Sequence, residues 1–201
     1  MALGGGCWTE LDRRPIESTA ISHETDDASE ARLPTDQDLL KRVAAGDGAA
    51  FGLLAERLTP LLRRVLFRLG LTEAEIEDSL QDALIRVWHR SASFEGRSAV
   101  SSWACRIALN LGVSALRTRK AATPSWPMTV ADTEMAWESR QQARAVREAV
   151  MELPIRLRAV IVLREFEGMT YRTIAEVLDI PVGTVMSRLH AARARLRRQL
   201  S

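Results

Sequence analysis

The stretch that most constrains this chain is residues 168–198, which read GMTYRTIAEVLDIPVGTVMSRLHAARARLRR. The pattern predicts a short helix, a tight turn at Asp179-Ile180-Pro181 and a second helix dense in arginine. This is the order of a helix-turn-helix, a unit that places its second helix in the major groove of DNA. The function of the remaining residues must therefore be sought in combination with this DNA-binding unit.

Local signals define both helices of the motif. Thr170 is the expected N-cap of the first helix, and Ala175 is small enough to let the two helices cross closely. Asp179 occupies the turn, where glycine would adopt a left-handed conformation at lower cost than aspartate. Pro181 lies near the first turn of the second helix, where its missing N–H does no harm. The side chains expected to face inward are Ile174, Ala175, Val177, Leu178, Val185, Leu189, Ala192 and Leu196.

A separate arc of the arginine-rich helix is left for DNA. The residues predicted to face bases and phosphates are Thr184, Ser187, Arg188, Ala191 and Arg195. Along the flank, phosphate contacts are expected from Arg193, Arg197 and Arg198. Residues 182–201 hold five arginines and no carboxylate, although the net charge of the whole chain is only +2. A solvated basic helix is the alternative interpretation, but the turn spacing and the separation of the two arcs favour DNA binding.

The fold class follows from the period of the apolar residues. Between residues 36 and 200 the apolar residues recur at helical spacing. No segment shows the alternation of apolar and polar residues that is typical of a strand. With 201 residues, 46% of them hydrophobic, the chain is long enough for two small cores. We expect an all-α protein with two small helical domains, a helical bundle at residues 36–117 and a helix-turn-helix domain at residues 134–201. A flexible linker is expected at residues 118–133, which contain Pro124 and Pro127.

Residues 1–35 are expected to form a disordered acidic tail. They are rich in Gly, Ser, Thr, Asp and Glu, and their apolar residues are scattered. Up to Asp36 the chain carries eight acidic residues and three basic ones. A solvated tail is the favoured interpretation, and a tail that folds back on the basic helix as a mimic of DNA is the alternative.

Several helix boundaries in the first domain can be predicted. The apolar period that begins after Asp36 is interrupted at residues 46–48 and ends at Gly70, a helix terminator. Thr72 and Glu75 are spaced as a capping box for the next helix. Its buried stripe is expected to be Ile76, Leu80, Ala83, Leu84, Val87 and Trp88, and its polar face Glu77, Asp78, Gln81, Asp82 and Arg86.

A polar loop at residues 91–101 follows, with one aromatic residue, Phe94, and one cation, Arg97. In the helix after it, one side is expected to carry Trp103, Ile107, Leu111 and Ser114. The side chains expected to project elsewhere are Arg106, Asn110 and Arg117. In the second domain, Pro154 is expected to open a helix.

Catalytic and metal-binding chemistry has no support in the sequence. Cys7 and Cys105 are far apart, His23, His89 and His190 lack metal-ligand spacing, and no glycine-rich phosphate loop is present. We therefore expect no enzyme activity, no cofactor and no metal. No stretch approaches the ~20 apolar residues that cross a bilayer, and the amino terminus lacks the basic start and apolar run of a lipoprotein signal. We expect a cytoplasmic protein without membrane insertion.

Three stretches in series identify a family resemblance. Residues 77–88 read EDSLQDALIRVW, residues 94–98 read FEGRS and are followed by Ser102-Trp103 and RIALN at 106–110, and residues 153–198 contain GMTY and IPVGTVMSR. In this order they resemble region 2, with its helix and its minus-ten loop, and region 4 of a group 4, or extracytoplasmic-function (ECF), sigma factor. These are sigma-70 family factors of bacterial RNA polymerase. The resemblance covers residues 36–200, whereas a helix-turn-helix alone would be a weak signal.

The resemblance implies a partner for each set of residues. The face that docks on the beta-prime clamp helices of core polymerase would be Asp78, Gln81, Asp82 and Arg86. The loop that captures a flipped base of the minus-ten element would be Phe94, Gly96, Arg97 and Ser98, with Arg106, Asn110 and Arg117 on the strand nearby. The minus-thirty-five element would meet Thr184, Ser187, Arg188, Ala191, Arg193, Arg195 and Arg197. The beta flap and an anti-sigma factor are further implied partners.

The sequence also departs from the family pattern. Leu84 replaces a usual phenylalanine, Met186 stands where lysine is common, and Asp179 stands where glycine is common. Cys105 replaces a bulkier residue and is most simply a small buried apolar group, with a redox sensor as the alternative. Phe94 has an alternative role as a cap over the local core.

Two functional classes remain in competition at this point. A dissociable initiation factor is expected to be a monomer when free and to bind promoter DNA weakly without polymerase. A stand-alone regulator whose amino-terminal helices dimerise is expected to bind duplex DNA tightly by itself.

Overall fold

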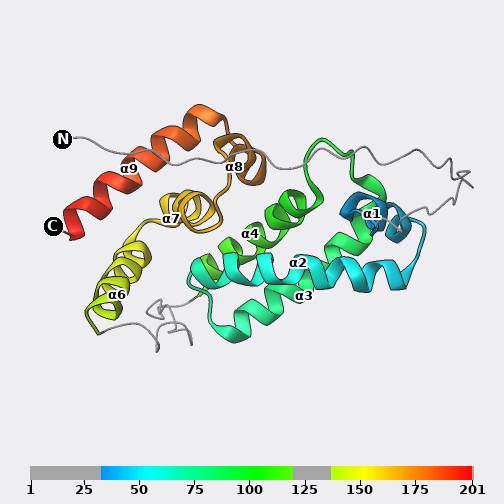
Figure 1. Cartoon of the computed structure of the whole chain (residues 1–201), viewed down its shortest axis with the longest axis horizontal. Coiled ribbons are helices and arrows are strands. Elements are labelled where there is room, and N and C mark those ends of the chain that lie inside the picture. Colours follow the sequence, from blue (N-terminus) through cyan, green and yellow to red (C-terminus); the bar gives the residue numbers. More distant parts are fainter. Residues whose placement is uncertain (1–32, 120–136, 201) are drawn as a thin grey trace, which may run out of the picture. The chain divides into compact units, whose positions relative to one another are not determined.

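The computed structural model describes residues 33–119 and 137–200, and within these two stretches the chain is helical without a strand (Figure 1). The all-α class predicted from the apolar period is therefore confirmed. Most of the predicted acidic tail and of the predicted linker lies outside the described residues. Residues 34–201 form one compact unit.

Four helices make up the first helical group, and their caps explain their boundaries. They are α1 (Asp36–Ala44), α2 (Gly48–Arg68), α3 (Glu73–Arg90) and α4 (Val100–Thr118). Thr35 and Asp38 form a capping box at the start of α1, and Asp47 accepts from the Ala50 N–H at the start of α2. The predicted capping box of α3 is confirmed, because the Thr72 hydroxyl accepts from the Glu75 N–H at 3.4 Å.

The loop before α4 is shorter than predicted. A 3₁₀ turn, η1 (Ser91–Ser93), continues from α3, and α4 begins at Val100. Trp103, Ile107, Leu111 and Ser114 lie along one side of α4 at helical spacing, but this side is only partly covered, because Ser114 is exposed and Trp103 and Leu111 are half-buried. The residues most completely buried are Ala104, Cys105, Ala108, Leu109 and Gly112. Helix α4 packs against α2, α3 and also α8, so two of its sides are covered rather than one.

The second helical group contains the predicted helix-turn-helix. Its helices are α6 (Trp137–Glu152), α7 (Ile155–Ile161), α8 (Tyr171–Leu178) and α9 (Val182–Leu200), with a π-helical turn, η2 (Val162–Phe166), after α7. Pro154 opens α7 as predicted, and the Thr170 hydroxyl caps α8 by accepting from the Thr173 N–H at 3.1 Å. The apolar sides of α7, α8 and α9 close a common core around Val160, Ile174 and Leu189.

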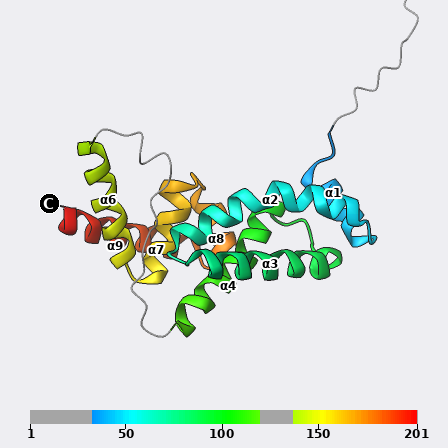
Figure 2. The ribbon, with the colours of Figure 1, turned by 90° about the horizontal axis from the view of Figure 1, so that it is seen from below.

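The two helical groups share a continuous core. Buried apolar residues of α4 and of α8 belong to one cluster, and α8 lies across α4 while η2 lies beside α2 (Figures 1 and 2). This packing of one group against the other was not predicted from the sequence.

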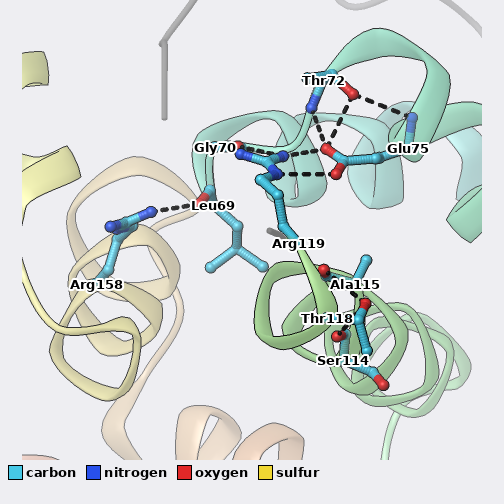
Figure 3. Close-up of polar contacts among 9 residues, drawn as sticks. All are labelled: Leu69, Gly70, Thr72, Glu75, Ser114, Ala115, Thr118, Arg119 and Arg158. Atoms are coloured by element: carbon cyan, nitrogen blue, oxygen red, sulfur yellow. Dashed lines mark hydrogen bonds and ion pairs between the residues drawn. The ribbon is translucent and has the colours of Figure 1, made fainter. Parts of the chain in front are cut away.

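Two arginines hold the turn between α2 and α3, residues 69–72 (Figure 3). Arg119, just past the end of α4, donates to the Gly70 carbonyl at 3.2 Å and to the Glu75 carboxylate at 2.9 Å. From α7, Arg158 donates to the Leu69 carbonyl at 2.7 Å. Gly70 has a φ of +90°, and a Cβ atom built on it would overlap the Met151 side chain. The turn therefore requires glycine for its backbone and for its close contact with α6.

Replacement of Gly70 by alanine is expected to lower the free energy of unfolding by about 1–3 kcal/mol, because the positive φ is strained for alanine and Met151 must move. Urea unfolding followed by circular dichroism measures this. Gly52→Ala is the matched control, since Gly52 lies inside α2 with no atom within 4 Å of an added Cβ. Alanine there should raise stability by about 0.5–1 kcal/mol. Equal losses from both changes would contradict this account of Gly70.

The stability of the first helical group is expected to depend on pH through Glu75. Hydrogen bonding from the Arg119 side chain lowers the pKa of Glu75 from 4.5 to about 2. Because the folded-state pKa lies below the ordinary value, the ionised carboxylate stabilises the fold above about pH 4.5, and this contribution is lost as pH falls toward 2.

The stability difference between the wild type and Glu75→Gln should therefore be full at pH 7 and shrink toward zero near pH 2. Urea unfolding at a series of pH values measures it. In an Arg119→Gln background the same Glu75 substitution should show a much smaller dependence on pH, since the cause of the lowered pKa has been removed. A difference that persists unchanged in that background would assign the pKa of Glu75 to another cause.

Candidate nucleic-acid interface

The helix-turn-helix has the geometry that its sequence predicts. Asp179 adopts the left-handed conformation at the end of α8, with a φ of 54°, and its N–H donates to the Ala175 carbonyl. In α9, the buried side chains that pack on the other helices of the second group are Val185, Leu189 and Ala192. A neighbouring arc of α9 is open to solvent, with Ser187, Ala191 and Arg195 exposed and Thr184 and Arg188 half-buried. These five predicted DNA-facing residues share one side of the helix.

The structure separates Arg193 from that arc. Arg193 donates to the Glu165 carboxylate of η2 at 2.6 Å, which raises the pKa of the arginine further. At about 100° per residue, Arg193 lies roughly opposite Thr184 on α9. Arg193 and Arg197 instead border an apolar groove of about 1040 Å³, together with Tyr171, Met186, Leu189, His190, Leu196 and Leu200. The sequence analysis placed Arg193, Arg197 and Arg198 together on the flank of α9, and of these three Arg198 lies nearest the DNA-facing arc.

The loop between η1 and α4 forms the second candidate contact with nucleic acid. The Phe94 ring packs against the Trp103 ring of α4, with centroids 5.2 Å apart and planes tilted by 52°. A pocket of about 440 Å³ lies beside this pair, and its lining includes Arg97, Ser98 and Arg106. A stacking surface next to cations is what unpaired bases bind. Phe94 is half-buried, so packing on Trp103 and contact with a base are both available to it.

The other predicted minus-ten residues are less closely grouped. Gly96 has a φ of 71° and borders a neighbouring hollow with Phe94 rather than the pocket itself. Asn110 is exposed on α4 one turn beyond Arg106, and Arg117 is exposed roughly 16 Å along the same helix. Arg117 therefore lies apart from the loop.

The pocket also contains residues that sequence reasoning did not assign to it. Glu176 of α8 and Asp179 line it from the second helical group. Arg106 donates through Nε to the Glu176 carbonyl at 2.9 Å, and its guanidinium lies 3.6 Å from the Asp179 carboxylate. No local sequence signal could have placed α8 there, because residues 106 and 176 are brought together only by the packing of the two groups.

The polar face of α3 is exposed, as predicted. Asp78, Gln81, Asp82 and Arg86 all point to solvent at helical spacing. Ile85 lies among them and is 46% exposed, which sequence reasoning missed. The face therefore offers one apolar side chain among its charges.

Three further features were considered among the described residues: a reactive thiol, a metal site and a membrane-spanning helix. Burial raises the pKa of the Cys105 thiol to about 12, which disfavours the reactive thiolate that a redox sensor needs. Within residues 33–119 and 137–200, no group of histidine, cysteine and carboxylate residues is arranged to hold a metal ion. None of the described helices combines the length and apolar character needed to cross a membrane.

Comparison with known proteins gives concordant results. Residues 54–122 match the family Sigma-70 region 2, and residues 143–196 match Sigma-70, region 4. The RNA polymerase sigma-H factor of Pseudomonas aeruginosa is 34% identical over 173 residues, which cover 79% of this chain and 90% of that protein. The ECF RNA polymerase sigma factor SigM of Mycobacterium tuberculosis is 37% identical over 170 residues, covering 83% and 85% of the two chains.

Two solved structures are similar in fold. CnrH, in complex with the cytosolic domain of CnrY, has a TM-score of 0.65 and 28% identity, over 82% of this chain and 96% of that one. The sigma factor RpoE of Bartonella quintana, in complex with the anti-sigma factor NepR, has a TM-score of 0.63 and 25% identity, over 75% of this chain and 96% of that one.

Proposed function

The chain belongs to the sigma-70 family as an extracytoplasmic-function (ECF) sigma factor, and we propose that it directs initiation through three separate surfaces. The observation that carries the proposal is that one chain presents a free DNA-facing arc on α9, an aromatic pocket beside α4 and an exposed polar face on α3. It acts by binding rather than by catalysis, in the cytoplasm where core polymerase is found.

The α9 arc reads duplex DNA in this proposal. Arg188 and Ser187 point from the first half of α9, the part of a recognition helix that reaches base edges. Arg195 and Arg198 lie farther along the same arc, where they are suited to phosphates. The minus-thirty-five element of the promoter is the assigned target.

The Phe94 loop opens the minus-ten element. Extruding a base costs a few kcal/mol, which stacking on an aromatic ring and enclosure in a pocket offset. Phe94 and Trp103 supply the stacking surface, and Arg97 lies at the rim where the backbone of the strand would pass.

The α3 face binds core polymerase. Asp78, Asp82 and Arg86 offer charges of both signs around the exposed Ile85 side chain. We assign this face to the beta-prime clamp helices and the second helical group to the beta flap. The residues given above for all three surfaces are our assignments.

An anti-sigma factor is the proposed regulator. RpoE of Bartonella quintana was solved in complex with the anti-sigma factor NepR, and this chain shares its fold at a TM-score of 0.63. Because a chain that exposes three binding surfaces must be kept from polymerase when it is not needed, we propose that a partner of this kind binds it.

Arg188→Ala is expected to weaken binding to promoter duplex and relax its base preference by about 1–3 kcal/mol, because a guanidinium at a base edge carries specificity. Fluorescence anisotropy with cognate and substituted duplexes measures both effects. Arg193→Ala is the matched control on the same helix. Its guanidinium bonds to Glu165 on the other side of α9, so affinity should stay within about twofold at physiological salt. Equal losses from both substitutions would overturn the assigned arc.

Run-off transcription with purified core polymerase tests the function as a whole. The wild-type protein should yield promoter-specific transcripts from a genomic promoter library. Asp82→Lys should yield few while keeping its melting temperature, because it reverses a charge on the α3 face without touching the core. Glu56→Lys, at an exposed position of α2, should remain active. A wild-type protein that yields no specific transcript, yet binds duplex tightly as a dimer, would favour a stand-alone regulator instead.

A further inference from the structure

The two helical groups are joined by an ion cluster around one buried carboxylate, Glu167, which pairs with two arginines of α2 that are partly exposed. Glu167, just after η2, has a side chain only 4% exposed. Its carboxylate accepts from Arg64 at 3.1 Å and also pairs with Arg68, one turn farther along α2. The Arg68 guanidinium also lies 5.2 Å from the centre of the Phe166 ring. A carboxylate so thoroughly withdrawn from water needs a positively charged partner, and both arginines offer one from α2.

A second contact between the groups lies at the loop pocket. Arg106, which faces DNA in the proposed function, donates instead to the Glu176 carbonyl of α8 and lies near the Asp179 carboxylate. The second helical group therefore adds two carboxylates, beside Glu95 of the loop itself, to a pocket whose proposed ligand is a polyanion. A phosphate entering this pocket would be repelled by Glu176 and Asp179 and would find Arg106 engaged.

The duplex-reading arc is not covered in the same arrangement. Ser187, Ala191 and Arg195 are exposed on α9. The contacts between the groups thus obstruct one of the two DNA-binding surfaces and leave the other open.

We propose that the Glu167–Arg64–Arg68 cluster is an autoinhibitory latch that holds α8 over the minus-ten pocket in the free protein. This inference rests on the proposed role of the Phe94 loop. Release of the latch moves Glu176 and Asp179 away from the pocket and frees Arg106 for nucleic acid. The closed form recognises duplex DNA through α9 but does not take up the single strand.

Glu167 is the residue at which to test the latch. The Arg106–Asp179 pair is weakly coupled, since Asp179 is 83% exposed and exposed pairs contribute little. Arg158 also bridges the groups, but it bonds to carbonyls of its own group at Met151 and Leu153, so replacing it would disturb the fold. Glu167→Gln removes the charge with little change in volume.

Glu165→Gln is the matched control. Glu165 lies two residues away in η2, and its carboxylate pairs with Arg193 of the same helical group. It therefore tests the loss of an equal charge and an ion pair without loss of the contact between groups.

The first measurement is small-angle X-ray scattering of the full-length free protein. Glu167→Gln and the Arg64→Gln/Arg68→Gln double variant should both raise the radius of gyration, while Glu165→Gln should not. The helical circular dichroism of each variant must stay at the wild-type level. The double variant removes the two arginine partners on α2 and so tests the latch even if Glu167→Gln impairs folding. An unchanged radius of gyration in both latch variants would overturn the latch.

The second measurement is the affinity of the free protein for a fluorescein-labelled single strand with the non-template minus-ten sequence mapped by run-off transcription. Both latch variants should bind it about 5- to 150-fold more tightly than wild type, the usual range of coupling between two conformations. Glu165→Gln should match wild type. Opening without a gain in single-strand affinity would also overturn the autoinhibitory role. Failure of the wild type to transcribe with core polymerase would instead defeat the proposed function, because the scattering result needs no DNA.

Discussion

The arrangement of this protein depends on how a buried guanidinium is satisfied. The Arg158 side chain is withdrawn from water and pairs with no carboxylate of the described residues, and burial, together with repulsion from Arg119, lowers its pKa from the ordinary value. Its charge is tolerated because it donates to the carbonyls of Leu69, Met151 and Leu153. One of these carbonyls ends α2 and the other two end α6, so the bonds of this one side chain tie the two helical groups together at the α2–α3 turn, although its Nε atom is buried without a hydrogen-bond partner among the described residues.

The positions of the functional surfaces follow from that constraint. With α7 held at the α2–α3 turn, η2 lies beside α2 and α8 lies across α4 (Figures 1 and 2). The α9 arc that we assign to duplex DNA stays accessible, while the aromatic pocket at Phe94 acquires Glu176 and Asp179 as neighbours. The two proposed DNA-binding surfaces therefore differ in their accessibility, which suits a factor proposed to open DNA only when polymerase is present.

Local features of the fold could be predicted because their causes are local. The Thr72 and Thr170 caps, the start of α7 at Pro154 and the left-handed turn at Asp179 each depend on side chains within a few residues of the backbone they serve. The exposed polar face of α3 could be predicted for the same reason. The buried sides of α4 could not, because α8 covers one of them from about seventy residues away in sequence. Arg193 was assigned to phosphate on the flank of α9, and its ion pair with Glu165 could not be predicted because that carboxylate lies 28 residues away in sequence.

The sequence by itself determined the helical class, the helix-turn-helix, the family and the residue types of each binding surface, since these are written in periodicity, caps and motif order. Only the tertiary structure decided which of those surfaces is open. Arg106 and Phe94 have the same chemistry in any arrangement, but their accessibility depends on α8, and Glu167 has a role only because Arg64 and Arg68 meet it across the two groups. Contacts between distant segments depend on shape and burial, which a linear pattern of residues does not contain.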